Sequence, residues 1–320
     1  MLDLACDDFE TFVASLPAVQ GRYLQTKRTV RTWRLRILPL GDVTVMRVRG
    51  GAVNVFHGAV PLDQLSLYLP LSPPDAVALG GERIGPGRIG LLAPGHDYLL
   101  RTDAVTDWLG IHIPLASVRH RFHPDDPVLT GLLANAAVID LPTPVLQDLV
   151  SLAGRLRAAA SAIPSPLAPD IARRQGAQQL LEAIFLAFAS AGQAKQPRQR
   201  RDRRHRLVAR CMAWVEQRLL EFPTVEDLCA LTGLSDRTLR TLFVEQIGLA
   251  PHQYLMKRRM QAIHQAMRRA RATDTVTAIC ARYGVWDLGR FAGQYRRLYG
   301  TLPSADLAQA RTAPMARGAT

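Results

Sequence analysis

VEDLCALTGLSDRTLRTLFVEQIGLAP (residues 225–251) and TVTAICARYGVWDLGRFAGQYRRLYGTLP (residues 275–303) are two copies of one pattern. In each copy a cysteine lies four residues before a glycine, Cys229 before Gly233 and Cys280 before Gly284. An apolar i, i+4 pair, a glycine and a proline then follow at identical spacings: Leu239, Phe243, Gly248 and Pro251, and Phe291, Tyr295, Gly300 and Pro303. The offset between the copies is 51 residues at first and 52 later, so the second turn has one extra residue.

Each copy has the sequence features of a helix-turn-helix unit. A short helix, predicted over 225–232 and again over 275–283, ends at a glycine suited to the left-handed conformation of a helix stop. The next helix begins at an N-capping residue, Ser235 or Asp287, and buries the apolar pair. Its outward face is the one that enters a major groove of DNA. We therefore predict DNA contacts from the outward residues, which are Arg237, Thr238, Arg240, Thr241, Arg290 and Gln294.

A long helix is predicted between the two copies. Pro251 suits a first helical position, and the helical pattern continues to about residue 271. Some 20 residues at about 1.5 Å each give roughly 30 Å. One turn of DNA is roughly 34 Å, so this connector is long enough to place two reading helices in successive major grooves.

The charge of the chain is concentrated in the same half. Residues 195–320 contain 23 lysines and arginines against 10 acidic residues, an excess that equals the net charge of +13 of the whole chain. Residues 1–194 are neutral, with 17 of each sign. This asymmetry indicates that the second half meets a polyanion and the first half does not. Residues 192–206, GQAKQPRQRRDRRHR, lack hydrophobic residues and are predicted to be a basic interdomain linker.

The first half reads as strands followed by helices, so the predicted fold class is α+β. β-rich runs at 43–49, 52–56, 65–71, 88–93, 97–101 and 107–113 are broken by turns such as Gly80-Gly81 and Pro94-Gly95. Their regular spacing predicts a small barrel or sandwich. Helical periodicity then predicts helices at 143–160 and 169–191. The predicted domains are 1–191 (barrel about 1–113, helices about 114–191), the linker 192–206, a DNA-binding domain 207–308, and a flexible tail 309–320.

Several function classes are disfavoured by the composition. No apolar run is long enough to span a bilayer, and the acidic N-terminus lacks the order of a signal peptide, so we expect a cytoplasmic protein. The four cysteines form no C-x-x-C pair, which argues against zinc sites and disulfides and favours small buried side chains. His57, His96 and His112 are isolated, with no His-x-His pair among the strands. The sequence shows no recognisable combination of a nucleophile with a general base, so neither a catalytic nor a metal site is predicted.

Residues 206–307 resemble the AraC/XylS family of transcription regulators. The matching residues of the first copy and connector are Asp227, Leu228, Thr232–Ser235, Arg237, Leu239, Phe243, Gly248, Pro251, Tyr254, Leu255 and Arg259. Those of the second copy are Gly284, Asp287, Phe291, Tyr295, Arg296, Gly300, Pro303 and Ser304. Val285 stands where the family usually has Phe, and Gly289 where it often has Ser. The stretch 288–292 resembles the branch of activators that respond to aromatic carboxylates such as benzoate, as does the short stretch 50–55.

The resemblance implies where bases are read. The family's base-reading positions fall on Arg237, Arg240 and Thr241 in the first copy and on Arg290 and Gly293 in the second. Arginine suits bidentate contact with guanine, worth roughly 1–3 kcal/mol of discrimination. Gly293 has no side chain, so sequence preference at that position is expected to be relaxed. The alternative for each arginine is a phosphate contact, which positions the protein without specifying sequence.

For residues 1–190 the resemblance implies a cupin-like β-barrel that senses a small molecule, followed by helices that join two subunits. An anionic aromatic effector would need a cation and flat apolar walls. The candidates are Trp33, Arg34, Tyr68, His96 and Trp108, each of which also suits an ordinary core or surface position. The candidate dimerisation stripe is Leu180, Leu181, Ile184, Phe185 and Phe188, and packing of this stripe on its own barrel is an equal alternative.

The resulting hypothesis is an effector-responsive activator and not an enzyme. It would bind repeated promoter half-sites in double-stranded DNA as a homodimer, recruit RNA polymerase and need no cofactor beyond its effector. A ligand-independent architectural DNA-binding protein is one alternative, which sequence-selective binding would contradict. A cupin-type enzyme with a DNA-binding appendage is the other, and the absence of a legible catalytic constellation argues against it.

Overall fold

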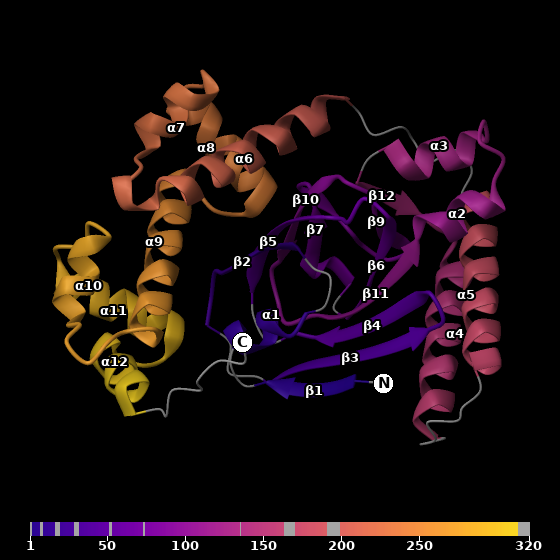
Figure 1. Cartoon of the computed structure of the whole chain (residues 1–320). Helices are drawn as coiled ribbons and strands as arrows, with labels where there is room; N and C mark the ends of the chain where they lie inside the picture. The colour runs from indigo at the N-terminus through magenta and orange to yellow at the C-terminus, as the bar shows by residue number, and fades with distance from the viewer. Residues whose placement is uncertain are drawn as a thin grey trace. The chain divides into compact units, whose positions relative to one another are not determined.

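A computed structural model of the chain describes residues 2–6, 9–16, 20–28, 32–50, 53–72, 74–134, 136–162, 170–190 and 199–312 (Figure 1). These residues fall into two compact units. The first lies within 1–23 and 29–206, and the second within 24–28 and 207–320. The N-terminal unit combines β-sheets with helices, and the C-terminal unit is helical, which confirms the predicted α+β fold class.

The first unit is built on two β-sheets. The larger has the strand order β1-β3-β4-β11-β6-β9-β12 and the smaller the order β2-β5-β10-β7-β8. The larger sheet consists of β1 (Leu2–Cys6), β3 (Trp33–Leu40), β4 (Val43–Arg49), β6 (Gln64–Ser72), β9 (Arg88–Leu92), β11 (Asp107–Pro114) and β12 (Ala137–Asp140). The smaller consists of β2 (Gln20–Gln25), β5 (Asn54–Ala59), β7 (Val77–Leu79), β8 (Glu82–Arg83) and β10 (Asp97–Thr102). Paired strands such as β4 and β11 or β5 and β10 run antiparallel.

The larger sheet is covered on both faces, which explains the apolar character of its strands. On one face, side chains such as Val45, Leu67 and Ile111 form a core with the helices of the unit. On the other face, Tyr68 and Leu92 pack with Phe56 and Leu100 of the smaller sheet. Strands buried on both sides read as continuous apolar runs and lose the polar alternation of a half-exposed strand.

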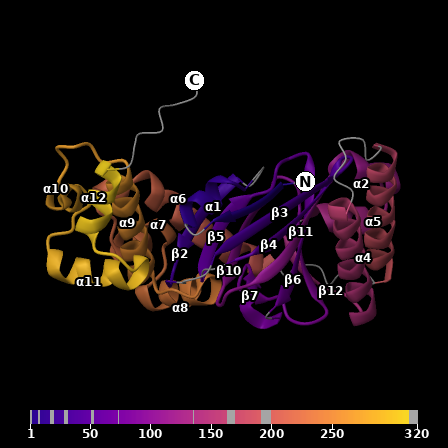
Figure 2. The ribbon, with the colours of Figure 1, turned by 90° about the horizontal axis from the view of Figure 1, so that it is seen from below.

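Two long helices cover the outer face of the larger sheet. They are α4 (Thr143–Ala162) and α5 (Asp170–Ser190), which lie side by side in Figures 1 and 2 and match the two helices predicted there. The shorter helices are α1 (Phe9–Ala14), α2 (Leu115–Arg121), α3 (Pro127–Ala134) and a 3-10 turn, η1 (Pro74–Ala76). Two local predictions were wrong. Helix α1 lies within the stretch predicted as strands, and β12 lies within the stretch predicted as helices, where it pairs with β9.

The predicted dimerisation stripe lies in the core of its own unit. Leu180, Ile184, Phe185 and Phe188 are buried against the larger sheet, and Leu181 packs partly buried beside them. These residues therefore pack onto the chain's own sheet, which is the alternative given with the prediction, and a role of α5 in dimerisation stays a prediction that concerns its exposed face. The large apolar side chains that α5 exposes are Ile171 and Leu186.

The second unit contains the two predicted helix-turn-helix units. Its helices are α6 (Gln199–Gln217, whose first residues belong to the first unit), α7 (Val225–Thr232), α8 (Asp236–Ile247), α9 (Pro251–Arg268), α10 (Val276–Arg282), α11 (Leu288–Tyr299) and α12 (Pro303–Thr312), with a 3-10 turn, η2 (Leu219–Glu221). The basic run predicted as a linker is thus helical from residue 199, and the predicted tail is helical to Thr312. Residues 192–198 and 313–320 lie outside the described residues. No described helix is long and apolar enough to cross a membrane.

The two turns differ in how tightly their glycines are enclosed. Gly233 and Gly284 both have the left-handed backbone, with φ of 70° and 69°. A Cβ at Gly233 would meet nothing within 4 Å, whereas a Cβ at Gly284 would lie 2.6 Å from Cδ1 of Phe222. The second turn therefore needs glycine both for its backbone conformation and for the close approach of an aromatic ring.

This difference predicts unequal losses of stability. Gly233→Ala should lower the free energy of unfolding of the second unit by about 1–2 kcal/mol through the left-handed backbone alone. Gly284→Ala should cost clearly more, because the Phe222 ring must also move. Urea denaturation of both variants, followed by circular dichroism, measures the difference. Equal losses would contradict the packing of Phe222 on this turn.

Candidate nucleic-acid interface

Helix α8 has a capped N-terminus, a buried inner face and an exposed outer face that carries arginines. Ser235 caps the helix by accepting from the backbone NH of Thr238, and Gly248 ends it in the left-handed conformation. Its inner face buries Leu239, Leu242, Phe243 and Ile247. Its predicted DNA-contacting residues, Arg237, Thr238, Arg240 and Thr241, are all exposed.

The threonines of α8 differ from its arginines in what they can still bind. The Thr241 hydroxyl donates to the backbone oxygen of Arg237 at 3.0 Å, and the Thr238 hydroxyl lies 2.9 Å from Ser235 Oγ. Neither Arg237 nor Arg240 has an ion-pair partner among the residues that the structure describes. The guanidinium groups are therefore the free donors of this surface, while each threonine hydroxyl already has a local bond.

Helix α11 repeats this arrangement, but its outer face carries fewer side chains. Asp287 caps it by accepting from the backbone NH of Arg290 at 2.9 Å, as the sequence predicted. Phe291, Tyr295 and Leu298 are buried on the inner face. Arg290 is exposed and Gln294 is half-buried. A Cβ at Gly293 would meet nothing within 4 Å, so this base-reading position of the family faces open space.

Helix α9 packs against both helix-turn-helix units. Near its start, the Tyr254 ring lies edge-on to Phe243 of α8 with ring centroids 5.9 Å apart. Near its end, Met260, Ile263 and Met267 share a buried cluster with Phe291 and Tyr295 of α11. Its 18 residues correspond to about 27 Å. One rigid element therefore sets the separation of α8 and α11.

A buried ion pair fixes the same helix to α6. Arg258 bonds Glu216 through Nε–Oε1 and through Nη2–Oε2 at 2.5 Å, and its Nη1 donates to Gln261 Oε1 at 2.6 Å. Both charged side chains are almost fully buried. Burial is the largest single effect and works against the charge of Arg258, but the hydrogen bond and charge of Glu216, together with Tyr254 and Tyr299, outweigh it and raise the pKa of the guanidinium. The two-point contact constrains rotation of α9 about its own axis.

A polar network holds α11 between α9 and α12. The Tyr295 hydroxyl donates to Asp306 Oδ2 at 2.6 Å and lies 2.6 Å from His264 Nδ1. Because the phenol proton goes to Asp306, Nδ1 of His264 is the donor toward the Tyr295 oxygen. Burial opposes the charge of Asp306, but hydrogen bonds from His264, Tyr295 and Thr301 outweigh it and hold the pKa of Asp306 below its ordinary value. His264 also stacks on Tyr299 with ring centroids 4.0 Å apart.

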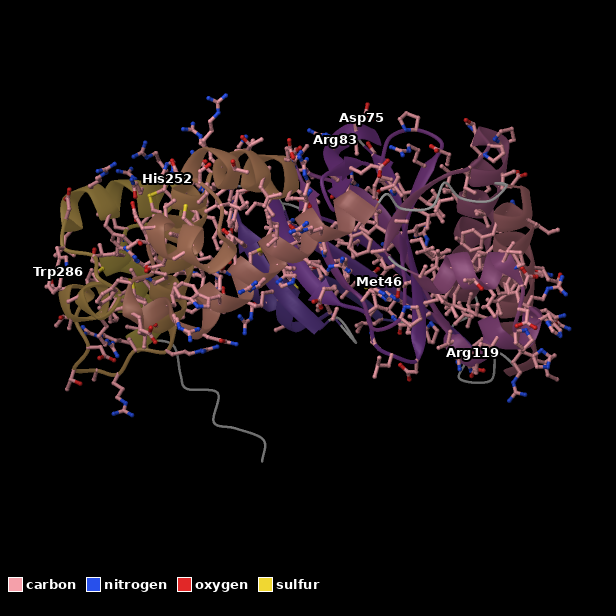
Figure 3. The ribbon with its side chains drawn as sticks, turned by 90° about the horizontal axis from the view of Figure 1, so that it is seen from above. Met46, Asp75, Arg83, Arg119, His252 and Trp286 are labelled. Carbon is pink, nitrogen blue, oxygen red and sulfur yellow. The ribbon has the colours of Figure 1, made fainter. Side chains whose placement is uncertain are left out.

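Trp286 is a surface residue that the sequence analysis missed. It belongs to the turn with the extra residue, directly before the cap of α11, and its side chain is 77% exposed. In Figure 3 it lies at the outer edge of the second unit. Val285, its neighbour, is partly buried in the adjacent core. The one-residue change in offset between the copies was the signal that marked this position.

The predicted effector residues do not form one group. Tyr68 and Trp108 stack with centroids 4.7 Å apart, whereas Trp33 stacks on Phe12 in a neighbouring cluster, against which Trp108 also packs. His96 bonds the backbone oxygen of Pro94 through Nδ1. Arg34 is exposed and follows Trp33 along β3, so the two side chains point to opposite faces of the sheet. The structure therefore does not place the predicted cation beside the aromatic walls.

Four further side chains lie with Tyr68 and Trp108 and were not predicted. Tyr23, Phe56 and Tyr98 pack in the same cluster between the sheets, with Phe56 in ring contact with both tyrosines. His112 lies on β11, two residues along the same face from Gly110 and four from Trp108. Among the described residues, no group of histidine, cysteine and acidic side chains is arranged to hold a metal ion.

Comparisons with known proteins match both units. Residues 24–186, just over half of the chain, match the AraC-binding-like domain, and residues 228–309 match a helix-turn-helix domain. The XylDLEGF operon transcriptional activator of Pseudomonas putida is 33% identical over 103 residues, which are 32% of this chain and 32% of that protein. The probable thc operon regulatory protein of Rhodococcus erythropolis is 38% identical over 92 residues, 28% of this chain and 27% of that protein. Each match covers less than a third of the relative's length.

Among solved structures, the AraC-like transcriptional activator CuxR is similar over 81% of this chain and 93% of its own chain. Its sequence identity is 17% and the TM-score is 0.45.

The network around Tyr295 predicts a pH-dependent loss of stability. Asp306→Asn should lower the free energy of unfolding of the second unit at pH 7 by about 1.5–3 kcal/mol, because hydrogen bonds to a charged acceptor are weakened. A lowered pKa in the folded state stabilises the fold above the unfolded value of about 3.9 and loses this effect as the pH falls through the folded value. The difference between variant and wild type should therefore shrink below about pH 4.

Urea midpoints at pH 7 and pH 3.5 test this, with Asp236→Asn as a control. Asp236 is an exposed carboxylate in the first turn of α8, and its replacement should cost less than about 1 kcal/mol. A loss for Asp306→Asn that is the same at both pH values would contradict the charged hydrogen-bond network.

Proposed function

Because the chain belongs to the AraC family of transcription regulators, we propose that it is an effector-responsive activator that binds repeated promoter half-sites as a dimer. Family membership makes it a DNA-binding regulator and not an enzyme, with a ligand-binding type of N-terminal domain. The observation that supports the proposal most is the pair of capped helices, α8 and α11, whose spacing is set by α9. Their exposed Arg237, Arg240 and Arg290 have no ion-pair partner among the described residues.

In the proposed complex α8 and α11 enter successive major grooves. Arg237 and Arg290, each two to three residues after its helix cap, contact guanine O6 and N7, because base contacts come from the N-terminal part of a recognition helix. Arg240 lies three residues after Arg237 on the same helix and is also exposed. Arg297, seven residues after Arg290, is exposed and one turn beyond Gly293, a place suited to a phosphate. The threonines of α8 offer their methyl groups, since their hydroxyls are already bonded.

Trp286 extends this surface before α11. An exposed indole directly before the N-terminus of a recognition helix lies beside the groove that this helix enters. There it contacts a thymine methyl group or the sugars of the backbone. This apolar contact compensates for the missing side chains at Gly289 and Gly293 on the outer face of α11.

Activation and dimerisation are the finer parts of the proposal. The Pseudomonas putida relative is described as an activator, which favours activation through RNA polymerase for this chain. A dimer joined through α5 would use its exposed face, where Ile171 and Leu186 lie, since the predicted stripe is buried. Effector binding in the first unit would favour the arrangement that binds DNA, because a ligand shifts an equilibrium only by its differential affinity for the two states.

Selection of genomic DNA fragments by the purified full-length protein tests the proposed function. Repeated sites whose major-groove segments lie about one helical turn apart are the expected result. Sequence-indifferent binding with only a steep salt dependence would contradict it and favour the architectural alternative.

The proposed base contact predicts a change in specificity. Arg290→Ala should cost about 1–3 kcal/mol on the selected site and remove discrimination at one base pair. Arg297→Ala, the matched change on the same face, should weaken binding to all sequences alike and reduce the salt slope by about one. Fluorescence anisotropy on the selected site and its single-base variants measures both. Uniform weakening by Arg290→Ala would mean that Arg290 contacts a phosphate.

The exposed tryptophan predicts a loss of DNA affinity without loss of stability. Trp286→Ala should weaken binding to the selected site by about 1–2 kcal/mol, the usual contribution of a buried apolar contact, and leave the urea midpoint unchanged. Leu220→Ala is the control, because Leu220 is also exposed in the second unit but precedes the first helix-turn-helix. Unchanged DNA affinity of Trp286→Ala would exclude the proposed contact.

A further inference from the structure

Three phenols lie between the two sheets of the first unit, with Tyr68 buried and Tyr23 and Tyr98 partly buried. Tyr23, Tyr68 and Tyr98 come from β2, β6 and β10, and burial raises the pKa of each well above its ordinary value. The groups lie close enough to influence one another, since Tyr23 and Tyr98 also raise the pKa of Tyr68. Buried hydroxyls normally have hydrogen-bond partners. The Tyr68 hydroxyl makes no hydrogen bond of ordinary geometry with a described residue, although the Thr106 side chain lies near enough to act as a hydrogen-bond donor that lowers the pKa of Tyr68.

A second polar atom without a partner lies on the neighbouring strand. His112 Nδ1 lies 3.0 Å from Gln64 Nε2 and 2.9 Å from Ser66 Oγ. An amide nitrogen only donates, so Nδ1 is the acceptor and the neutral ring carries its proton on Nε2. Burial lowers the pKa of His112 to about 4, so the ring is neutral at physiological pH. The Nε2 atom is buried and has no partner in the described part of the chain.

Both atoms belong to one contiguous surface. In the pairing of β6 with β11, Tyr68 lies opposite Gly110 and Ser66 opposite His112, so these residues share the inner face. A Cβ at Gly110 would lie 3.1 Å from the Trp108 ring, 3.3 Å from His112 Nε2 and 3.4 Å from the Met46 methyl group. The bare backbone of Gly110 therefore lies between an aromatic ring, an apolar methyl group and a hydrogen-bond donor.

The charges of the described strands are arranged away from this surface. Side chains alternate between the faces of a strand, so Arg34, Arg36, Arg47 and Arg49 share the outer face with Val43 and Val45 of the helix-covered core. Arg47 is paired there with Asp107. The one cation at an inner position of a described strand is Arg88, and its guanidinium bonds Glu82, Asp140 and the Arg83 backbone oxygen.

From this arrangement we infer that the effector of the first unit is a neutral molecule with a hydrogen-bond acceptor, such as a carbonyl oxygen, on an apolar or aromatic body. The inference rests on the proposed effector-responsive function. The acceptor receives hydrogen bonds from His112 Nε2 and the Tyr68 hydroxyl, and the body packs on Trp108 and Met46. A carboxylate is disfavoured, because burying an anion without a paired cation costs far more than burying a neutral oxygen. We therefore expect neutral analogues, such as aromatic amides or ketones, as the effector class in place of the aromatic carboxylate that the sequence resemblance implies.

The test uses full-length protein and matched probes: benzoate, benzamide and acetophenone, and 2-naphthoate with 2-naphthamide. Isothermal titration at pH 7.5 should show the neutral members binding at least about tenfold more tightly than the carboxylates. Tyr68→Phe should weaken the neutral probes by about three- to tenfold, the effect of one hydrogen bond between neutral groups. Tyr283→Phe, the same change in the second unit, should have no effect. Tighter binding of the carboxylates, or no binding of any probe, would overturn the inference.

A measurement without any ligand tests the Tyr68 hydroxyl itself. Tyr68→Phe removes a buried hydroxyl that makes no hydrogen bond of ordinary geometry within the fold, so the urea midpoint of the protein should stay equal or rise. A clear fall would show that the hydroxyl is satisfied within the fold and would overturn the inference. The proposed function is tested separately by selection of DNA sites. If the protein binds DNA selectively but does not bind the neutral probes, this inference alone is refuted. If it binds DNA without sequence preference, the proposed regulatory function is refuted.

Discussion

The DNA-binding half depends on the packing of one helix, α9, against two others. Its first turns contact α8 through Tyr254 and Phe243, and its last turns contact α11 through Met260, Ile263 and Met267. The ion pair between Arg258 and Glu216 fixes its rotation against α6. Because the connector is rigid and about 27 Å long, α8 and α11 can enter successive major grooves only when the two DNA segments lie one helical turn apart.

The two reading helices are stabilised by different means. Helix α8 is held by a continuous apolar face, by the Ser235 cap at its start and by the glycine stop Gly248 at its end. Helix α11 contains Gly289 in its first turn and Gly293 in its interior, and a glycine in a helix interior costs roughly 0.5–1 kcal/mol relative to alanine. The Asp287 cap and the hydrogen bonds that join Tyr295 to His264 and Asp306 offset this cost. Helix α11 therefore stays folded and in position although Gly289 and Gly293 leave its outer face with few side chains.

The features that the sequence predicted are local ones. The caps Ser235 and Asp287 and the glycine stops follow from backbone requirements within a few residues, and the 51-residue repeat placed both units. Strand β3 was missed although it does alternate, with Trp33 and Leu35 buried on either side of the exposed Arg34. Strand β12 was missed because it has only four residues, too few to show a period, and follows a helix. Trp33 and Arg34, two of the five effector candidates, lie on opposite faces of β3, because adjacent strand residues point to opposite sides. The placement of Tyr68, Trp108 and His112 on one face of the sheet depends on strand register, which no local sequence pattern reveals.

The rigid spacing of α8 and α11 is most directly tested by changing the spacing of the DNA. The full-length protein is titrated against a selected site and against the same site with about 5 or about 10 base pairs inserted between the two major-groove segments. A half-turn insertion puts the second segment on the opposite side of the duplex. The structure predicts that either insertion abolishes simultaneous contact and reduces the affinity to that of a single segment. Affinity that is unchanged by the half-turn insertion would contradict a fixed connector.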